Sequence, residues 1–277
     1  MNRPVSRLHK GGSAEFRFTL SPDGLTYISH QAVAYPFHVT RPFYLEGDPK
    51  GMATLYLQSV SGGLFDEDVV NLTLHADDNA RAHVTTQSST IVHSTETSYA
   101  EQQTCIHAGE HACIEYLPDP LVLFPRAHLH SQIRVVADKT ASVVVCDGFL
   151  AHDPEGVGAM FERLSNELRI ESPDGKLRCL DRFEVSGQEL SSYNEYRAHG
   201  AFVFVDGDVD ETTRLALSKS LMTVNGIYAG VSSLPDDAGL WSRILALDSQ
   251  SLRNAISVAW TTLRELKTGV RPHPRRK

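Results

Sequence analysis

The chain has 277 residues, of which 41% are hydrophobic, and a formal net charge of −8 at pH 7. This length and hydrophobic content allow a substantial core and exclude a disordered chain, and the acidic charge argues against general nucleic-acid binding. No apolar run approaches the ~20 residues that cross a bilayer, and the first residues, MNRPVSRLHKGGS, lack the apolar stretch of a signal peptide. We therefore expect a soluble, cytoplasmic protein that contacts neither nucleic acid nor membrane.

The four cysteines agree with the expected cytoplasmic location. They form no C-x-x-C motif and are sparse for a secreted disulfide scaffold. We expect reduced thiols that pack as small hydrophobic side chains: Cys105, Cys113, Cys146 and Cys179.

Alternation of apolar and polar residues dominates the chain from residue 14 to about residue 206. In AEFRFTL (14–20) and VNLTLHA (70–76) every second residue is apolar, which predicts half-buried strands in antiparallel pairs. Further strands are predicted at ATLYLQS, RAHVTTQ, TCIHA, HACIEYL, SQIRVVA, ASVVVCD, NELRIES, KLRCLDRFEVS and AFVFVDGD, separated by turn signals such as HADDNA and SPDGK. We find no fixed repeat and no Ser- or Pro-rich linker, so we expect residues 1–277 to form a single domain.

The pattern becomes helical after residue 206. Residues 211–222, ETTRLALSKSLM, begin with acidic side chains that suit the positive end of a helix. A second helix is predicted from an N-cap at Ser249 to a terminating Gly269. The predicted fold class is therefore mainly β over residues 14–206, with two α-helices near the C-terminus within residues 211–268.

The second predicted helix carries an apolar stripe at helical spacing. Its members are Leu252, Ile256, Trp260, Leu263 and Leu266. Two interpretations remain open: the stripe packs on the protein's own sheet, or its Trp260 and Leu263 part docks a partner, as exposed Trp-bearing faces tend to do. The basic end of the chain, residues 270–277, is either solvated or contacts an acidic partner.

The stretch CIHAGEHAC (105–113) is a possible metal site. If the chain turns at residues 108–110, an antiparallel hairpin puts four ligands for Zn²⁺ or Ni²⁺ on one face. These ligands are Cys105, His107, His111 and Cys113. Because strand side chains project in near-parallel directions, they suit a tetrahedral site poorly, and we expect no tight metal site there.

The centre of this stretch, HAGEH, also matches the H-x-x-E-H pattern of a class of zinc peptidases. In that interpretation His107, Glu110 and His111 form the centre of a zinc-dependent hydrolase. The motif works on a helix, however, and here it holds a glycine between strand-like runs. The sequence has no G-x-S-x-G, Walker A or G-x-G-x-x-G motif. We expect that the protein is not an enzyme and keep the zinc hydrolase as the alternative.

Three longer strings resemble the UreD/UreH family of urease accessory proteins. They are RPFYLEGDPKGMATLYLQSVSGGLFDED, ARAHVTTQSSTIVH and AEQQTCIHAGEHACIEYLPDPLVLFPRAHL. In the family's order, they carry a strand ending in S-G-G-L with an acidic loop, a T-T-Q-S strand, a Gly turn and an E-Y-L-P segment. The resemblance covers most of the chain and is strongest from about residue 41 to residue 150.

The resemblance implies a non-enzymatic maturation factor with a β-rich, partly helically wound fold. It implies binding to UreF, through UreF to the nickel-carrying GTPase UreG, and to apo-urease. The implied outcome is delivery of Ni²⁺ to urease, with Ni²⁺ in transit and no permanently bound cofactor. A polar passage through the UreD-like subunit is the implied route.

A cation in transit needs oxygen ligands that hold it weakly at several places. The candidates are Asp66, Glu67, Asp68, Glu115 and Asp147, then Glu46 and Asp48, and the polar strand residues Thr86, Gln87 and Ser88. Many relatives carry Gly-Gly-Asp at the acidic loop, so the family role carries over better to Asp68 than to Asp66 or Glu67. Asp147 is flanked by apolar residues, which predicts burial.

Each candidate also has a structural interpretation. The loop acids can face solvent, the polar strand can be an exposed face, and Glu115 can be a structural acid. The family pattern requires no Cys or His in CIHAGEHAC. We therefore interpret that stretch as a hairpin that positions Glu115 on the strand face shared with His111 and Cys113.

Overall fold

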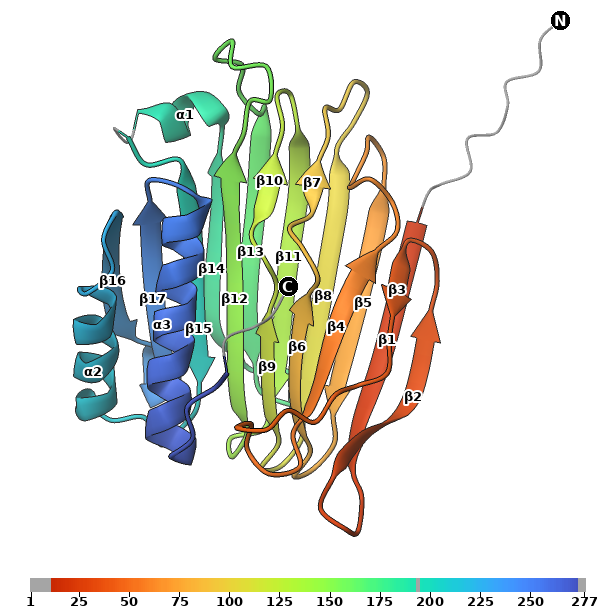
Figure 1. Cartoon of the computed structure of the whole chain (residues 1–277), viewed down its shortest axis with the longest axis vertical. Helices are drawn as coiled ribbons and strands as arrows, with labels where there is room; N and C mark the ends of the chain where they lie inside the picture. Colours follow the sequence, from red (N-terminus) through yellow and green to blue (C-terminus); the bar gives the residue numbers. More distant parts are fainter. Residues whose placement is uncertain (1–10, 193–194, 274–277) are drawn as a thin grey trace, which may run out of the picture.

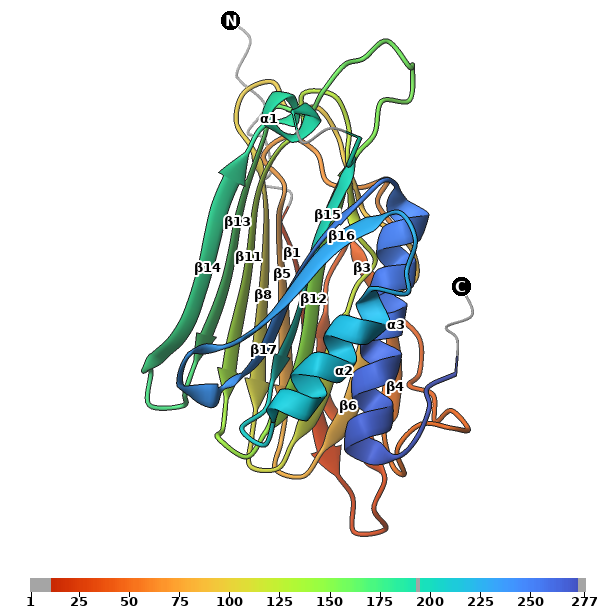
Figure 2. The same cartoon turned by 90° about the vertical axis from the view of Figure 1, so that its left-hand side faces the viewer.

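The structure, a computed structural model, describes residues 11–192 and 195–273. Two β-sheets face each other, and two helices cover the outer face of one sheet (Figures 1 and 2). The seven-stranded sheet contains β1 (Gly11–Leu20), β2 (Thr26–Val33), β5 (Val69–Ala76), β8 (Ala100–Ala108), β11 (His128–Ala137), β13 (Arg163–Glu171) and β14 (Leu177–Val185). The ten-stranded sheet contains β3 (Phe37–Val39), β4 (Ala53–Ser59), β6 (Arg81–Thr86), β7 (Ile91–Val92), β9 (Cys113–Leu117), β10 (Leu121–Leu123), β12 (Ser142–Ala151), β15 (Ala198–Val205), β16 (Ile227–Ser233) and β17 (Gly239–Ala246).

The chain winds between the two sheets as a β-solenoid. Successive passes β5, β8, β11 and β13 lie side by side and parallel in one sheet, while β4, β6, β9 and β12 do the same in the other. The mainly β class with helical winding is confirmed. The prediction of antiparallel pairing is wrong for these central strands and correct for outer pairs such as β1 with β2 and β13 with β14. A two-residue period reports which face a side chain occupies, and it is the same in parallel and antiparallel sheets.

Short corners connect the sheets at one end of the solenoid. Residues 77–80, 109–112 and 138–141 link β5 to β6, β8 to β9, and β11 to β12. Backbone bonds join neighbouring corners: the N–H groups of Asn79 and Cys113 donate to the carbonyls of Glu110 (2.8 Å) and Ala80 (2.9 Å). The last residues of the three corners, Ala80, Ala112 and Ala141, are buried in the interior.

The hairpin predicted at CIHAGEHAC is therefore wrong. Cys105 and His107 lie on β8 in the seven-stranded sheet, whereas Cys113 begins β9 in the ten-stranded sheet. His111 has a positive φ of 54° at the corner between them. The chain crosses from sheet to sheet here and does not fold back on its own strand.

The helices are α1 (Gly187–Ser191), α2 (Glu211–Leu221) and α3 (Ser249–Thr268). The two longer helices are those predicted, but the N-cap of α3 is Asp248, whose side chain accepts from the Ser251 N–H, and not Ser249. Gly269 ends α3 in the left-handed conformation, as predicted (φ 68°). Strands β16 and β17 follow α2, so the β structure extends beyond the predicted limit at residue 206; β17 is almost entirely buried and shows no alternation.

The apolar stripe of α3 packs on the ten-stranded sheet. Trp260 and Leu263 are 5% and 2% exposed and share a cluster with strand residues such as Phe202. This supports packing on the protein's own sheet and leaves no exposed Trp face for a partner; only Leu266, at 51% exposure, extends into solvent. No described helix is long and apolar enough to span a bilayer. Of the predicted basic tail, residues 274–277 lie outside the described residues.

We predict that Ala112→Leu destabilises the protein by about 1–3 kcal/mol, because the corner interior has no room for the added carbons. Urea unfolding followed by circular dichroism measures the change. Glu110→Ala, at an exposed position of the same corner, is the control and should stay within about 0.5 kcal/mol of wild type. Equal stabilities for wild type and Ala112→Leu would contradict tight stacking of the corners.

Candidate functional site

Two neighbouring cavities lie between the sheets. The first has a volume of about 250 Å³ and reaches the surface at the exposed Ser59, Gly62 and Ser88. The second has a volume of about 50 Å³ and contains Asp147. Four residues line both cavities: Thr86, Thr90, Gln102 and Tyr116. We call the two cavities together the passage; their walls include hydroxyl, amide and carboxylate oxygens.

Asp147 lies at the inner end of the passage. Its Oδ2 accepts from Asn166 Nδ2 at 2.8 Å, across from the other sheet, and its Oδ1 accepts from the Ala201 N–H at 3.1 Å. Enclosure between the sheets raises the pKa of Asp147, although both hydrogen bonds oppose that rise. Asp147 is half-buried, so the burial predicted from its apolar neighbours is reached only in part. Asn166 was missed, because nothing in its strand pattern distinguishes it from other polar positions.

The predicted polar strand divides between two surfaces. Thr86 and Ser88 line the passage, whereas Gln87 lines a groove on the outer face of the ten-stranded sheet. Alternation along an extended segment accounts for this split. Glu46 lines the same outer groove as Gln87, so the structure does not bring these two candidates together with Asp147.

The three acids of the loop before β5 have different environments. Asp66 accepts from the Thr97 hydroxyl (2.7 Å) and N–H (2.9 Å), and these bonds lower its pKa to about 2. Glu67 has a positive φ of 65° and also contacts the Thr97 hydroxyl, at 3.5 Å. Asp68 is 7% exposed, and its Oδ2 accepts from the Phe65 N–H at 2.8 Å. Among the described residues, Asp68 Oδ1 is buried and has no hydrogen-bond partner, and Asp68 is not one of the residues that line the passage.

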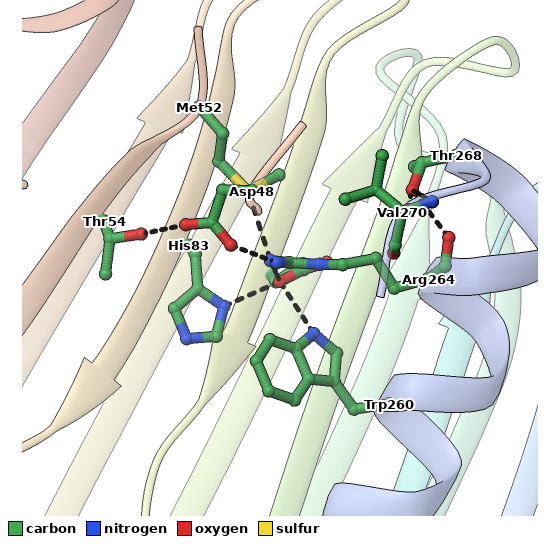
Figure 3. Close-up of polar contacts among 9 residues, drawn as sticks. Asp48, Met52, Thr54, His83, Trp260, Arg264, Thr268 and Val270 are labelled. Atoms are coloured by element: carbon green, nitrogen blue, oxygen red, sulfur yellow. Dashed lines mark hydrogen bonds and ion pairs between the residues drawn. The ribbon is translucent and has the colours of Figure 1, made fainter. Parts of the chain in front are cut away.

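Glu115 lies elsewhere, on β9, where its hydrogen-bond partners include Trp260 and Arg264 of α3; Figure 3 shows Trp260 and Arg264 beside His83 and Asp48. Glu115 accepts from His83 Nδ1 at 2.6 Å, Trp260 Nε1 at 2.9 Å and Arg264 Nε at 3.0 Å. Arg264 also pairs with Asp48, and its guanidinium lies 4.6 Å from the Trp260 ring centroid. We call Asp48, His83, Glu115, Trp260 and Arg264 the α3 cluster.

The α3 cluster joins α3 to the ten-stranded sheet. The Arg264 side chain is 1% exposed and those of Glu115 and Asp48 are 5% and 7% exposed. Burial alone would raise the pKa of Glu115, but the hydrogen bond and charge of His83, together with Arg264, lower it to about 2. Because its oxygens are already bonded inside the cluster, Glu115 acts as a structural acid. Sequence reasoning missed Arg264, whose signal is a charged residue four positions after Trp260 within the apolar stripe.

The four possible metal ligands of CIHAGEHAC do not converge. Cys105 Sγ lies 3.2 Å from His107 Nε2, and the His107 ring stacks on His75 with 4.6 Å between centroids. Cys113 lies in the other sheet, where burial raises the pKa of its thiol to about 12. In the described part of the chain, no group of three or more His, Cys, Asp or Glu is arranged to hold a metal. HAGEH spans a strand end and a corner, not a helix, so it lacks the geometry of the peptidase motif.

The winding of the strands and the passage between them define a two-sheet β-solenoid scaffold with a polar interior route. A family model described as UreD urease accessory protein matches residues 10–277. Urease accessory protein UreD 1 of Pseudomonas syringae pv. tomato (strain DC3000) is 39% identical over 275 residues, covering 97% of this chain and 96% of the relative. The same-named proteins of Pseudomonas syringae pv. syringae (strain B728a) and Methylorubrum extorquens (strain PA1) are 38% and 36% identical, covering 96% and 91% of this chain and 95% and 87% of theirs. The chain belongs to the UreD family of urease accessory proteins.

We predict that Glu115→Gln destabilises the protein by about 3–5 kcal/mol at pH 7, because Arg264 loses its buried countercharge. The folded pKa of about 2 lies below the ordinary value of 4.5. The contribution of Glu115 is therefore complete above about pH 4.5 and lost as the pH falls through about 2. The free energy of unfolding, measured by urea titration across this pH window, should depend less on pH in the variant than in the wild type.

The matched control is Glu265→Gln, on the neighbouring residue of α3. Its side chain is 43% exposed and lies 3.9 Å from Arg271, so the change should cost less than about 1 kcal/mol. Equal effects of the two substitutions would show that the α3 cluster does not hold the helix.

Proposed function

We propose that this chain is a non-enzymatic scaffold that works with UreF- and UreG-like proteins on apo-urease and conducts Ni²⁺ through its passage. Membership of the UreD family supports the accessory role. The observation that supports the nickel route is a pair of adjoining cavities between the sheets, lined in part by hydroxyl and amide groups, with the carboxylate of Asp147 in the inner one.

The chemistry of the passage suits a cation in transit. Hydroxyl and amide oxygens from Thr86, Thr90 and Gln102 can replace part of the ion's water without holding it tightly. Asp119 and Asp147 line the inner cavity and add carboxylate oxygens there. Soft thiolate and imidazole ligands would bind Ni²⁺ more strongly and stop its movement. Side chains alternate between the two faces of β8, so Cys105 and His107 lie on the face opposite to the passage residue Gln102.

Asp147 keeps the proposed role, because it lines the passage. Asp68 is buried with an oxygen free of described hydrogen bonds but does not line the passage. Glu115 and Asp48 are assigned to the α3 cluster instead. The proposed state of the protein carries Ni²⁺ as cargo and no resident cofactor.

Reconstitution tests the proposal as a whole. Apo-urease, nickel, and UreF- and UreG-like proteins should give active urease when this chain is present and little activity when it is omitted. Activity and nickel per urease, measured by elemental analysis, are the readouts. Full nickel loading without this chain at the same nickel concentration would reject the proposal.

We predict that Asp147→Asn lowers nickel loading of urease by at least about tenfold while leaving co-purification with UreF intact. The amide keeps the shape of the side chain but removes the charge that attracts the cation. Because the pKa of Asp147 is raised, its carboxylate is protonated at a higher pH than an exposed carboxylate would be. Nickel loading of urease by the wild type should therefore begin to fall at that higher pH. Asp138→Asn, at a half-exposed corner position outside the passage, is the matched control. Loss of UreF binding in Asp147→Asn would assign Asp147 a structural role.

A further inference from the structure

A surface groove lies near the inner end of the passage, at the edge where β14 faces β16 and β17. This open groove of about 490 Å³ lies between β14, β16 and β17, and its walls include Cys179, Asp181, Ser232, Trp241 and Arg243. The inner end of the passage approaches the same edge, because Phe183 of β14 lines the cavity that holds Asp147. Groove and passage are separate spaces with shared neighbours.

The barrier between these spaces is built around Arg243. Its Nη2 lies 2.6 Å from Asp181 Oδ1 and its Nη1 lies 3.2 Å from His199 Nε2. Its guanidinium carbon lies 5.5 Å from the Phe183 ring centroid and 5.8 Å from that of Trp241. Arg243 therefore lines the groove while its guanidinium lies over the ring of Phe183, which lines the passage.

We infer that the Arg243 and Asp181 pair is the closed gate of a second mouth of the passage, opening onto the β14, β16 and β17 groove. This inference rests on the proposed nickel route. It gives the route two ends, one at Ser59, Gly62 and Ser88 and the other at the gate.

The charges at the gate explain why it must move for a cation to pass. In the closed position a guanidinium stands close to Asp147, near enough to favour the ionised form of that carboxylate, and it repels an approaching cation. When Arg243 turns away, Asp181 is left with a free carboxylate. Opening thus replaces a positive charge on the route by an oxygen ligand.

The surroundings allow this movement. The Arg243 side chain is 40% exposed and that of Asp181 is 25% exposed, so both charges stay hydrated when the pair separates. His199 is buried, and burial with the nearby Arg243 charge lowers its pKa to about 3. It remains uncharged at neutral pH, and among the described residues its Nδ1 has no hydrogen-bond partner. A neutral imidazole beside the opening does not repel a cation.

Cysteine accessibility tests the gate without nickel. Ser131→Cys places a thiol in the passage wall at a position that is 4% exposed, with little change in size. The probe is 2-aminoethyl methanethiosulfonate, a small cationic thiol reagent, and mass spectrometry of the tryptic peptide 127–134 measures its reaction. This peptide contains no native cysteine.

Adding Arg243→Ala to Ser131→Cys should raise the labelling rate at residue 131 by at least about tenfold. Asp181→Asn, which breaks the pair and keeps its size, should raise it by a smaller factor. The matched control is Arg182→Ala, the adjacent residue, whose side chain is 64% exposed and pairs with Glu167; labelling there should stay at the Ser131→Cys rate. Circular dichroism confirms that each variant is folded.

Unchanged labelling in folded Arg243→Ala and Asp181→Asn variants would overturn the gate. A rise of equal size in Arg182→Ala would also overturn it, because general loosening would then explain the access. Nickel loading of urease is measured separately on the Arg243→Ala variant. Faster labelling with unaffected nickel loading supports the gate as a physical barrier and counts against nickel as the cargo, so the two proposals fail in distinguishable ways.

Discussion

Parallel backbone hydrogen bonding between successive turns of the solenoid is the constraint on which the rest of this structure depends. Each turn adds one strand to each sheet, and the ladders hold equivalent positions of neighbouring turns in line. Where those positions are apolar they fill the interior, as Phe16, Leu74 and Ile106 do. Towards the other end of the strands they become polar, at Thr86, Gln102 and Asn166. The passage is the interior of the same solenoid with a different set of side chains.

The C-terminal part is attached to this solenoid in a different way. After β12 the sheet grows by antiparallel strands, and α2 and α3 cover its outer face. Apolar packing supplies most of the attachment, since each large buried side chain contributes about 1.5–3 kcal/mol. The α3 cluster fixes the position of the helix along the sheet, because Arg264 can reach both Glu115 and Asp48 in only one register of α3 on the sheet. Buried ion pairs add little net stability but penalise other arrangements.

Face alternation and helical spacing are local signals, and they predicted most of the long strands and both long helices. The strands β2, β3, β7, β10, β16 and β17 were not predicted. Pairing direction was not predictable from these local signals. One signal went unused: ADDNA, AGEHA and ADKTA mark the three stacked corners, each ending in an alanine that is buried. These strings begin 32 and 29 residues apart (76 to 108 to 137), a spacing typical of coiled repeats.

The candidate site was predicted in part. The position of Asp147 followed from its apolar neighbours and that of Thr86 from the polar strand, and both line the passage. Glu115 was a candidate for the passage, but it lies in the α3 cluster. A strand has two faces, and its sequence does not say which one meets a helix residue 149 positions further along the chain. Arg243 and Asn166 act through partners on other strands, so no local pattern identifies them.

The connections between strands differ between the two ends of the solenoid. Its short corners at residues 77–80, 109–112 and 138–141 bond to one another through their backbones. At the opposite end, longer connections such as residues 93–99 and 152–162 join the strands. Inserting a residue into a corner would shift every ladder that follows it, whereas a longer loop at the other end leaves the ladders in place. Evolution can therefore rewrite one end of the molecule while the other keeps the register, and the mouth at Ser59, Gly62 and Ser88 is built from connections between strands, where new contacts can arise without refolding the scaffold.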